Sequence, residues 1–530
     1  MTRPLSRRYL LFTVFVSGWV VLTVEIAAAR LLGTFFGTGN LIWATIIGLI
    51  LVYLTVGYYL GGTLADRWPF PRVWFTILAW AGLGVALLPL VSRPVLVLIA
   101  DAFETLRGGL LLGAFLAVVV LFAVPVTLLG IITPFALRLD LRHPDEAGRV
   151  GGRLYAISTL GSLLGTFAPV LVWIPWLGTR RTLVLHGAVL VLVALEGLRR
   201  TEGLRAALRL AWMLLPLAGL WLWAARAPLK PLPGLLYETE STYNYIYVVQ
   251  RDELRMLYLN EGLGVHSVYH PRQMAFQGTW MHFLPAPFLN PPPFGPENVR
   301  RMAVIGLAGG TVARQAAVAF PGVDIHGFEI DPAIVDVARR YFALDDIPNL
   351  KVWTVDGRVG IRRQPGPYDL IVVDAYRPPD IPWHLTTVEF FSLLYQRLSP
   401  QGAISVNVGR TPTDRRLVDA LATTLDQVFP VVYGVDIPNT LNTILYAAKN
   451  PQAHPRYLAE HATRLAASGA SPLLVAAVAS AAQHPSSPFG QGWVLTDDRA
   501  AIEYLTNLLV VRYAWESGVQ SITSPEVRSP

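Results

Sequence analysis

The stretch MAVIGLAGG, residues 302–310, decides the fold of the C-terminal part of the chain. The apolar run Met302–Ile305 predicts a short buried strand, and the residues after the turn follow a helical pattern. Gly306, Gly309 and Gly310 allow the backbone of this turn to approach a ligand, because no side chain stands in the way. A strand, a glycine-rich turn and a helix in this order are typical of a nucleotide-binding sheet.

Further apolar strands alternate with helical segments on both sides of this stretch. The later strands are expected at Val323–Phe328, Leu350–Thr354, Leu370–Val373 and Ala403–Val408, with Val431–Tyr433 and Thr443–Ala448 as a closing pair. This alternation predicts a doubly wound, Rossmann-like α/β domain with a largely parallel sheet. Upstream, Leu236–His270 predicts a β-hairpin that turns at Arg251-Asp252-Glu253.

Acidic residues stand at the ends of three successive predicted strands. Glu329 lies 23 residues after Gly306 (329 − 306), close to the ~20 expected for an acid that binds ribose hydroxyls. Asp356, before Gly357, is placed to accept from an adenine amino group, and Asp374 faces the place where chemistry would occur. Each acid alone would also serve as a helix cap or as a solvated loop carboxylate. Together with the glycine-rich turn, their register predicts a binding site for an adenosine-type ligand.

The N-terminal part of the chain is a series of long apolar stretches. Hydrophobic residues make up 53% of the chain and charged residues 15%, against about 25% charged in soluble domains. The candidate membrane spans, judged by the ~20 apolar residues that a span needs, are Tyr9–Leu32, Leu41–Gly61, Val73–Val91, Gly109–Leu137, Tyr155–Leu177, Thr182–Leu198 and Ala207–Ala225. Pro94–Phe103 is too short to span, and we expect a re-entrant or interfacial piece there.

The predicted spans carry several residues that suggest packing or function. Glu25 lies within the first span, where an acid marks either a functional site or a structural carboxylate paired with a neighbouring helix. The pairs Gly57/Gly61 and Gly161/Gly165 have the spacing for close contact between helices.

Composition narrows the chemistry that the chain can perform. It has no cysteine, which excludes disulfides, thiolate catalysis and Cys-ligated zinc or iron–sulfur centres. No group of His, Asp and Glu residues has metal-ligand spacing, so we expect no metal. The net charge of +7 comes with arginines at the ends of the apolar stretches. We interpret these arginines as signals of membrane topology in preference to nucleic-acid contacts.

Several motifs, taken jointly, resemble one enzyme family. They are Glu240-Ser241-Thr242-Tyr243-Asn244, Leu259–Gly262, Val304–Gly310, Glu329-Ile330-Asp331, Asp356-Gly357, Tyr368–Asp374, Ile381–Thr387 and Leu495–Arg499. The chain with these motifs resembles the spermidine synthase family of aminopropyltransferases, in its bacterial membrane-fused branch with transporter-like helices.

This resemblance implies a reaction and a site. The co-substrate would be decarboxylated S-adenosylmethionine, with no tightly bound cofactor, and the aminopropyl group would pass to an amine such as putrescine. Glu329 would hold the ribose with Gly306, Gly309, Gly310 and Gly357 nearby, Asp356 would hold adenine, and Asp374 would act on the reacting region. Weaker candidates for binding the amine are Tyr243, Asn244, Asp380, His384, Asp497 and Asp498.

The chain departs from the family pattern at residues that should face an amine. Soluble members carry aspartates where this chain has Gly309 and Arg377, and a glutamine where it has Asn244. Two alternatives therefore stay open: an S-adenosylmethionine-dependent methyltransferase, and a non-catalytic sensor or transporter of polyamines or adenosyl ligands. His384 would act either as a base or as a structural pin of its loop.

The predicted organisation is a transmembrane helical domain at residues 1–228, a β-hairpin subdomain at 229–290 and a Rossmann-like domain at 291–530. We expect the chain in the plasma (inner) membrane, with the lipid bilayer and a small amine as partners and no nucleic acid; a homo-oligomer is left open. Arg3, Arg7 and Arg8 predict an N-terminus inside the cell, so seven spans put the C-terminal domain outside. Cytoplasmic supply of an adenosyl donor puts it inside, which is the expectation we retain.

Overall fold

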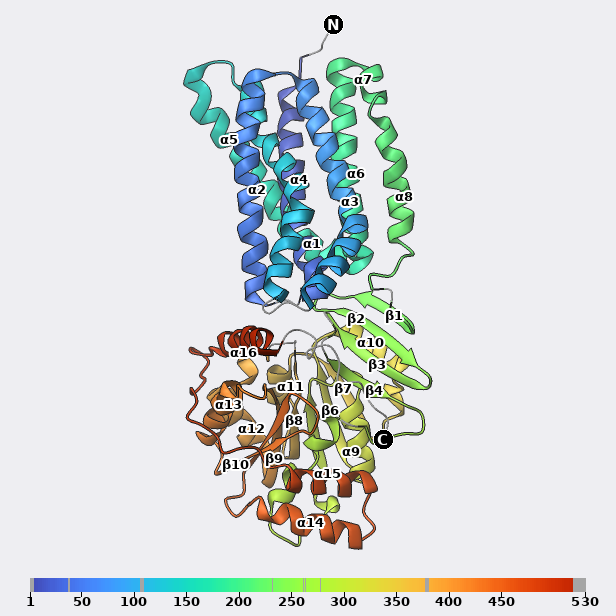
Figure 1. Ribbon diagram of the computed structural model, residues 1–530, viewed down its shortest axis with the longest axis vertical. Helices are drawn as coiled ribbons and strands as arrows, with labels where there is room; N and C mark the ends of the chain where they lie inside the picture. Colours follow the sequence, from blue (N-terminus) through green and yellow to red (C-terminus); the bar gives the residue numbers. More distant parts are fainter. Residues whose placement is uncertain are drawn as a thin grey trace. The chain divides into compact units, whose positions relative to one another are not determined.

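The computed structural model describes residues 4–36, 39–104, 109–230, 232–260, 262, 264–276, 278–376 and 381–517. The chain divides into two compact units (Figure 1). The helical unit comprises Met1–Pro231 with Thr239–Tyr245, and the sheet unit comprises Leu232–Glu238 with Ile246–Pro530. The segment Thr239–Tyr245 thus belongs by its contacts to the helical unit, although it follows the start of the first strand.

The helical unit consists of long apolar helices joined by short turns. Its elements are α1 (Arg7–Phe36), α2 (Asn40–Arg67), α3 (Pro71–Glu104), α4 (Gly109–Asp140), η1 (Pro144–Glu146), α5 (Ala147–Ala168), η2 (Pro169–Trp173), α6 (Ile174–Glu202), α7 (Leu204–Leu208), η3 (Ala211–Met213) and α8 (Leu214–Ala224). Among the described residues, five helical stretches are long and apolar enough to cross a membrane. One of them, Pro144–Glu202, is 59 residues long and holds both α5 and α6.

The chain reverses direction between α5 and α6. On α5, Gly161 lies against the carbonyl of Phe15 and Gly165 lies against the carbonyl of Trp19, both on α1. Since residue numbers increase in the same direction on both helices, α1 and α5 are parallel. The α6 helix is antiparallel to α1, because the Tyr9 hydroxyl donates to the carbonyl of Val193 at 2.6 Å whereas the Trp19 ring lies 5.1 Å from that of His186. The break falls at Gly178, whose φ of 77° is not helical.

The stretch Pro94–Phe103 is not a separate piece, and that expectation is wrong. It continues α3, which runs unbroken from Pro71 to Glu104 with Pro89 and Pro94 inside it. Proline inside a helix removes one hydrogen bond, and neighbouring groups in a bundle can compensate for that loss.

The predicted contacts at small residues are confirmed. A Cβ atom at Gly161 or Gly165 would overlap with the backbone of α1, and one at Gly57 or Gly61 would overlap with the backbone of α4. The pairs therefore allow the helix backbones to touch, as small residues do between membrane helices.

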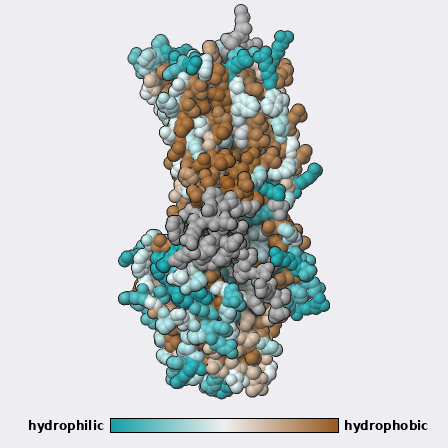
Figure 2. Space-filling model, in the orientation of Figure 1, coloured by the Kyte–Doolittle hydropathy of each residue, from teal (hydrophilic) through white to brown (hydrophobic). Residues whose placement is uncertain are grey.

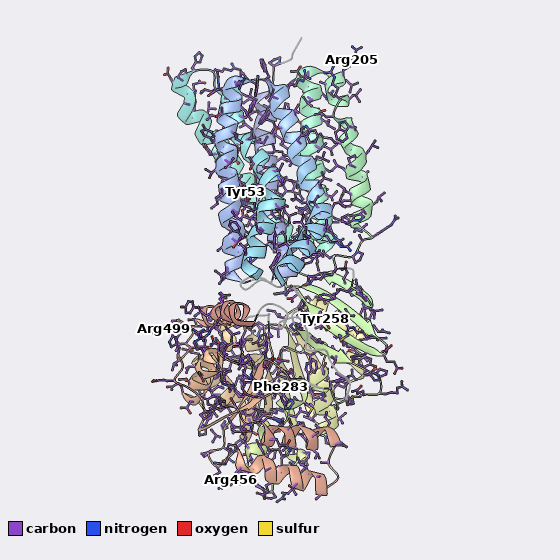
Figure 3. All side chains as sticks on the ribbon, viewed as in Figure 1. Tyr53, Arg205, Tyr258, Phe283, Arg456 and Arg499 are labelled. Carbon is purple, nitrogen blue, oxygen red and sulfur yellow. The ribbon has the colours of Figure 1, made fainter. Side chains whose placement is uncertain are left out.

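The surface of the helical unit is largely apolar. Figure 2 shows large brown areas over this unit. Its large exposed apolar side chains include Leu51, Leu98 and Leu171. Tyr53 lies on α2 in Figure 3. A soluble protein rarely exposes so much contiguous apolar surface, whereas a lipid-facing bundle does.

The sheet unit begins with a four-stranded antiparallel sheet in the order β1-β2-β3-β4. Its strands are β1 (Leu235–Glu240), β2 (Tyr245–Arg251), β3 (Leu254–Leu259) and β4 (Val265–Tyr269). The predicted hairpin is β2–β3, and Asp252 takes a positive φ of 54° in its turn. Tyr247 and Tyr258 stack across the pair with ring centroids 5.2 Å apart, which stabilises the register.

The second sheet has seven strands in the order β10-β11-β9-β8-β5-β6-β7. They are β5 (Arg301–Ile305), β6 (Asp324–Glu329), β7 (Leu350–Thr354), β8 (Tyr368–Val373), β9 (Leu398–Gly409), β10 (Val431–Asp436) and β11 (Asn442–Ala448). The first five of these run parallel, and β11 and β10 are antiparallel additions at one edge. The predicted doubly wound sheet with a closing strand pair is therefore confirmed.

Helices cover this sheet and bury its apolar strands. The helices of the sheet unit are α9 (Thr311–Ala319), α10 (Pro332–Tyr341), α11 (Gly357–Arg363), α12 (Val388–Arg397), α13 (Arg416–Asp426), α14 (Arg456–Ala467), α15 (Pro472–Gln483) and α16 (Ile502–Ser517), of which the last three pack on other helices and turns. Phe283, labelled in Figure 3, and Phe390 are fully buried, as are Met302 and Leu370 on the two central strands. The rigid core holds the carboxyl ends of the strands in place, and these ends carry the candidate site.

Candidate active site

The strand order changes direction between β5 and β8, and the candidate site lies there. After β5 the chain continues to one side through β6 and β7, and returns through β8 and β9 on the other. Ligands of doubly wound sheets bind at the carboxyl ends of strands beside this switch point. The glycine-rich turn follows β5, Glu329 ends β6, and Asp374 follows β8, so the structure brings these predicted elements to one edge.

Gly306 and Gly310 are glycines because of their backbone conformation and their surroundings. Their φ angles are 86° and 83°, values that other residues rarely adopt. A Cβ atom at Gly306 would come within 2.7 Å of Ala375, the residue after Asp374. The turn therefore packs directly against the end of β8.

Gly309 contacts strand β4. Its N–H donates to the Ser267 hydroxyl at 2.8 Å, and an added Cβ would lie 2.7 Å from the Ser267 Cβ. The side chain of Phe342 closes the same space. Soluble members of the family that the sequence resembles carry an aspartate at this position. That side chain would not fit here without a shift of the β4 backbone.

Glu329 is a buried carboxylate held by the backbone of the turn. It accepts hydrogen bonds from the N–H of Ala308 at 3.0 Å and of Asp331 at 3.1 Å. Burial raises the pKa of Glu329 to about 7, although these N–H groups act to lower it. A carboxylate fixed in this way beside the turn can accept from ribose hydroxyls.

Asp356 and His384 form a hydrogen-bonded pair. The Asp356 carboxylate accepts from Val359 N–H at 3.1 Å, capping α11, and lies 2.8 Å from His384 Nε2. The hydrogen bond from His384 holds the pKa of Asp356 below its ordinary value. His384 therefore fixes the predicted adenine acid, while neighbouring Trp383 exposes 44% of its surface and offers an aromatic face.

Asp497 is not free to bind an amine, because Arg358 already holds it. The guanidinium donates to both carboxylate oxygens at 2.7 Å and also to the carbonyl of His384 at 3.1 Å. The Thr387 hydroxyl donates to Asp497 at 2.7 Å. Asp498 lies outside this network and accepts only from Thr496, at 2.6 Å, among the hydrogen bonds of the described residues.

Asp374 is oriented by two asparagines that the sequence did not single out. Asn407 near the end of β9 donates from its side-chain amide to Asp374 Oδ1 at 2.9 Å, and the Asn442 side-chain amide donates to Asn407 Oδ1 at 2.7 Å. Burial raises the pKa of Asp374 to about 7, and the Asn407 hydrogen bond opposes that shift. The sequence could have pointed to Asn407, because it stands near the end of a predicted strand. It could not have pointed to Asn442, because the contact of Asn442 with Asn407 depends on the pairing of β11 with β9.

The remaining predicted residues lie outside the sheet unit or outside the described residues. Tyr243 and Asn244 lie in the segment that clusters with the helical unit, where the Asn244 N–H donates to the Ser241 hydroxyl at 2.8 Å. Asp380 and Arg377 lie outside the described residues.

The chain is similar to known proteins over its C-terminal part. Residues 289–453 match the model of the spermine/spermidine synthase domain. A probable polyamine aminopropyl transferase of Bifidobacterium longum is 32% identical over 308 residues, covering 54% of this chain and 66% of that protein. A polyamine aminopropyltransferase of Vibrio vulnificus is 31% identical over 212 residues, covering 38% and 68%. The chain thus spans about two thirds of the length of these curated relatives.

A solved structure is also similar. A probable spermidine synthase from Corynebacterium glutamicum superposes with a TM-score of 0.38 and 20% sequence identity, covering 49% of this chain and 99% of that one. The matches to the domain model and to the two curated relatives confirm the resemblance and the transferase class that the sequence predicts. The chain belongs to the spermidine synthase family of polyamine aminopropyltransferases.

Proposed function

We propose that the chain transfers the aminopropyl group of decarboxylated S-adenosylmethionine to an amine. The observation that carries this proposal is Asp374, a desolvated acid with a pKa raised to about 7, in register with the glycine-rich turn and Glu329. A base poised near neutrality is suited to taking a proton from an amine nucleophile. Family membership supports the same reaction class.

The step needs no group beyond the two substrates and Asp374. The nitrogen lone pair of the amine attacks the carbon beside the sulfonium, a C–N bond forms and the C–S bond breaks. The bonding electrons go to sulfur, which leaves as the neutral thioether methylthioadenosine. Ionised Asp374 takes the proton from the attacking nitrogen, since an ammonium has no lone pair to attack with. Glu329 and Asp356 would hold the ribose and adenine in place.

Putrescine is the acceptor that the resemblance implies, but this chain lacks two of the carboxylates that would bind a diamine. Gly309 stands at one of these positions, and its space is filled by Ser267 and Phe342. Asp497 is already paired with Arg358. We therefore propose that the acceptor substrate is an amine, without assigning it the second ammonium group of a diamine.

A turnover assay tests this proposal. The full chain in detergent or lipid is given decarboxylated S-adenosylmethionine and a panel of amines, and methylthioadenosine is measured. We expect release that depends on the amine and falls by about 100-fold or more in Asp374→Asn, in the range typical for a lost general base.

The control is Asp426→Asn, which removes an exposed acid at the end of α13. It should leave turnover unchanged. Methyl transfer from intact S-adenosylmethionine, with no product from the decarboxylated form, would replace the proposal by the methyltransferase alternative.

We also propose that the helical unit resides in a lipid bilayer, with the sheet unit in the cytoplasm where an adenosyl donor is made. The five long apolar stretches and their apolar surface support membrane insertion.

A further inference from the structure

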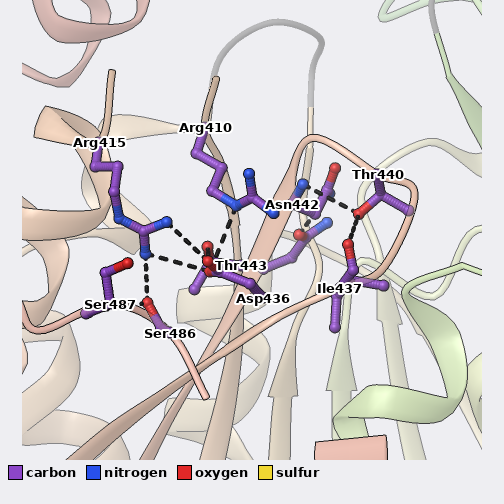
Figure 4. Close-up of polar contacts among 10 residues, drawn as sticks. Arg410, Arg415, Asp436, Ile437, Thr440, Asn442, Thr443, Ser486 and Ser487 are labelled. Atoms are coloured by element: carbon purple, nitrogen blue, oxygen red, sulfur yellow. Dashed lines mark hydrogen bonds and ion pairs between the residues drawn. The ribbon is translucent and has the colours of Figure 1, made fainter. Parts of the chain in front are cut away.

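A guanidinium lies beside the asparagines that orient Asp374. Arg410 follows directly after β9, Asp436 ends β10, and Asn442 begins β11, the strand that pairs with β9. Because β10 and β11 are antiparallel, the end of one and the start of the other lie at the carboxyl edge of β9. Figure 4 shows Arg410 among these residues, with its guanidinium on the Asn442 side of Asp436.

Asp436 is bound mainly by a different arginine. Arg415 donates to both of its carboxylate oxygens, at 2.9 and 3.2 Å, and the Thr443 hydroxyl donates to it at 2.6 Å. The Arg410 Nε atom lies 3.4 Å from the same carboxylate, as an ion pair without a hydrogen bond. The hydrogen bonds from Arg415 and Thr443 therefore occupy most of the acceptor sites of Asp436, and few remain for Arg410.

Arg410 is largely buried, and its one ion pair among the described residues is with Asp436. Only 14% of its side chain is exposed, and its Nε has no hydrogen-bond partner. No side-chain hydrogen bond of Arg410 occurs anywhere in the described part of the chain. A guanidinium has five N–H donors, and leaving the buried Nε donor of Arg410 unpaired is costly, while its Nη groups stay available to a ligand. An acceptor from outside the chain would satisfy them.

The charge of the cluster favours an anion. Arg410 and Arg415 bring two positive charges, and Asp436 brings one negative charge. A second ammonium group of a diamine would be repelled here, whereas a carboxylate would meet a fork of donors that matches its geometry.

We propose that Arg410 binds a carboxylate of the acceptor, so that the acceptor is a short amino acid whose amine is distant from its acid group. This inference rests on the proposed aminopropyl transfer. Asn407 and Arg410 are three residues apart at the end of an extended strand, which separates their Cα atoms by roughly 10 Å and directs their side chains to opposite faces, so the acceptor would pass over the carboxyl end of β9. That separation leaves room for a short carbon chain between an amine at Asp374 and an acid at Arg410.

The reaction keeps the balance of the proposed step. The amine nitrogen of the amino acid forms the new C–N bond, methylthioadenosine leaves with the sulfur electron pair, and Asp374 takes the proton. The carboxylate stays unchanged in the product, which is an N-(3-aminopropyl)amino acid.

Two acceptors of equal chain length test the proposal on the full chain. These are 4-aminobutanoate and 1,4-diaminobutane, which differ only in whether the far end carries an acid or an ammonium. Methylthioadenosine release is measured for both with the natural chain, with Arg410→Gln and with Arg415→Gln. Donor affinity is measured in parallel by calorimetry.

We expect 4-aminobutanoate to have the higher kcat/KM in the natural chain. Arg410→Gln should lower that kcat/KM by roughly tenfold to 150-fold, as for a lost hydrogen bond to a charged group, with donor affinity unchanged. Arg415→Gln removes the same charge but not the proposed contact, so it should keep the preference for the acid.

Release with 1,4-diaminobutane but not with 4-aminobutanoate would overturn the assignment of Arg410 and leave aminopropyl transfer standing. An equal loss of preference in both arginine variants would also overturn it, since the effect would then belong to the cluster charge. No release with either acceptor would overturn both proposals.

Discussion

Asp374 and Asn407 set the pH at which the proposed base works. Since burial raises the pKa of Asp374 to about 7, the ionised base accumulates as pH rises through that value. We expect kcat/KM to rise with pH and to reach half its limit near pH 7. Asn407→Leu removes a hydrogen bond that favours the ionised form, so the pKa rises further.

The measurement is the pH profile of methylthioadenosine release by the Asn407→Leu variant. Its acidic limb should move upward by about one pH unit, because one unit corresponds to roughly 1.4 kcal/mol, the scale of a single hydrogen bond. Asn442→Ala should move it in the same direction but less, since Asn442 acts through Asn407. A limb that stays in place in both variants would show that Asn407 does not position the base.

The buried Glu329 should lower the stability of the ligand-free chain while it contributes to binding of the donor. Its pKa is raised from an ordinary value of 4.5 to about 7 by burial, so the folded state keeps a proton that the unfolded state has lost. Stability therefore falls as pH rises between these two values and is constant above them. Glu329→Gln should increase the unfolding free energy of the ligand-free chain at pH 8 by up to about 3 kcal/mol, and its Tm should rise accordingly.

The same variant should differ little in Tm at pH 4, where Glu329 is mostly protonated in both states. It should bind the donor at least tenfold more weakly, because an amide accepts fewer hydrogen bonds than a carboxylate. Thermal unfolding at the two pH values and calorimetry measure these effects. A variant that is less stable at pH 8 would contradict the burial cost assigned to Glu329.

The acids of the site could be predicted because each follows a recognisable strand. Glu329, Asp356 and Asp374 end apolar runs, and parallel strands bring such ends together. Asn407 and Asn442 could not be predicted as a pair, because their contact depends on the antiparallel insertion of β11 beside β9. Nor could the sequence show that Arg358 occupies Asp497, since that pair joins residues 139 positions apart.

At the scale of elements, the loop that carries His384 is fixed by a network from the C-terminal region. Arg358 on α11 joins Asp497 to the carbonyl of His384, and His384 holds Asp356. Asp497→Asn should release Arg358 and loosen this loop, so that donor affinity falls by about three- to tenfold, the value of roughly one hydrogen bond.

Asp498→Asn is a matched control, because it changes the neighbouring residue, whose carboxylate accepts a hydrogen bond only from Thr496 within the described part of the chain. Its donor affinity should equal that of the natural chain. Calorimetric titration of both variants distinguishes the two acids. Equal losses would indicate that both acids contact the donor, as the sequence alone allowed.

The strands of the large sheet and its doubly wound class followed from the sequence, but contacts between elements did not. The apolar runs and turns predicted each strand of the seven-stranded sheet to within a few residues. The four-stranded sheet appeared only as one hairpin, because β1 and β4 are short and less apolar. The placement of Ser267 of β4 against Gly309 depends on how this sheet meets the turn.

At the scale of the whole molecule, contacts between glycines and neighbouring backbones should determine whether the helical unit assembles. Gly161→Leu places a side chain into the backbone of α1, so we expect a loss of folded, detergent-extractable protein and a lower Tm. Gly152→Leu is the control on the same helix, because an added Cβ there meets nothing within 4 Å. Size-exclusion profiles and thermal unfolding measure both, and equal behaviour would contradict the α1–α5 packing.

The orientation of the chain can be measured directly, because it contains no cysteine. Single cysteines at exposed Gly148 and Ala466 are labelled in intact cells with a membrane-impermeant maleimide. If the sheet unit is cytoplasmic and the helical unit crosses seven times, Gly148→Cys reacts and Ala466→Cys is protected. The arginines near Arg142 and Arg200 favour the reverse pattern, which would contradict cytoplasmic use of the donor.

The most direct test of the proposed reaction is calorimetric titration of the full chain with decarboxylated S-adenosylmethionine, intact S-adenosylmethionine and methylthioadenosine. Asp356→Ala, checked for folding by its Tm, serves as the control. We expect the decarboxylated form to bind at least tenfold tighter than the intact form, and the variant to lose affinity for all three ligands. Tighter binding of intact S-adenosylmethionine would contradict aminopropyl transfer, and absence of binding to all three would contradict an adenosyl site at this edge of the sheet.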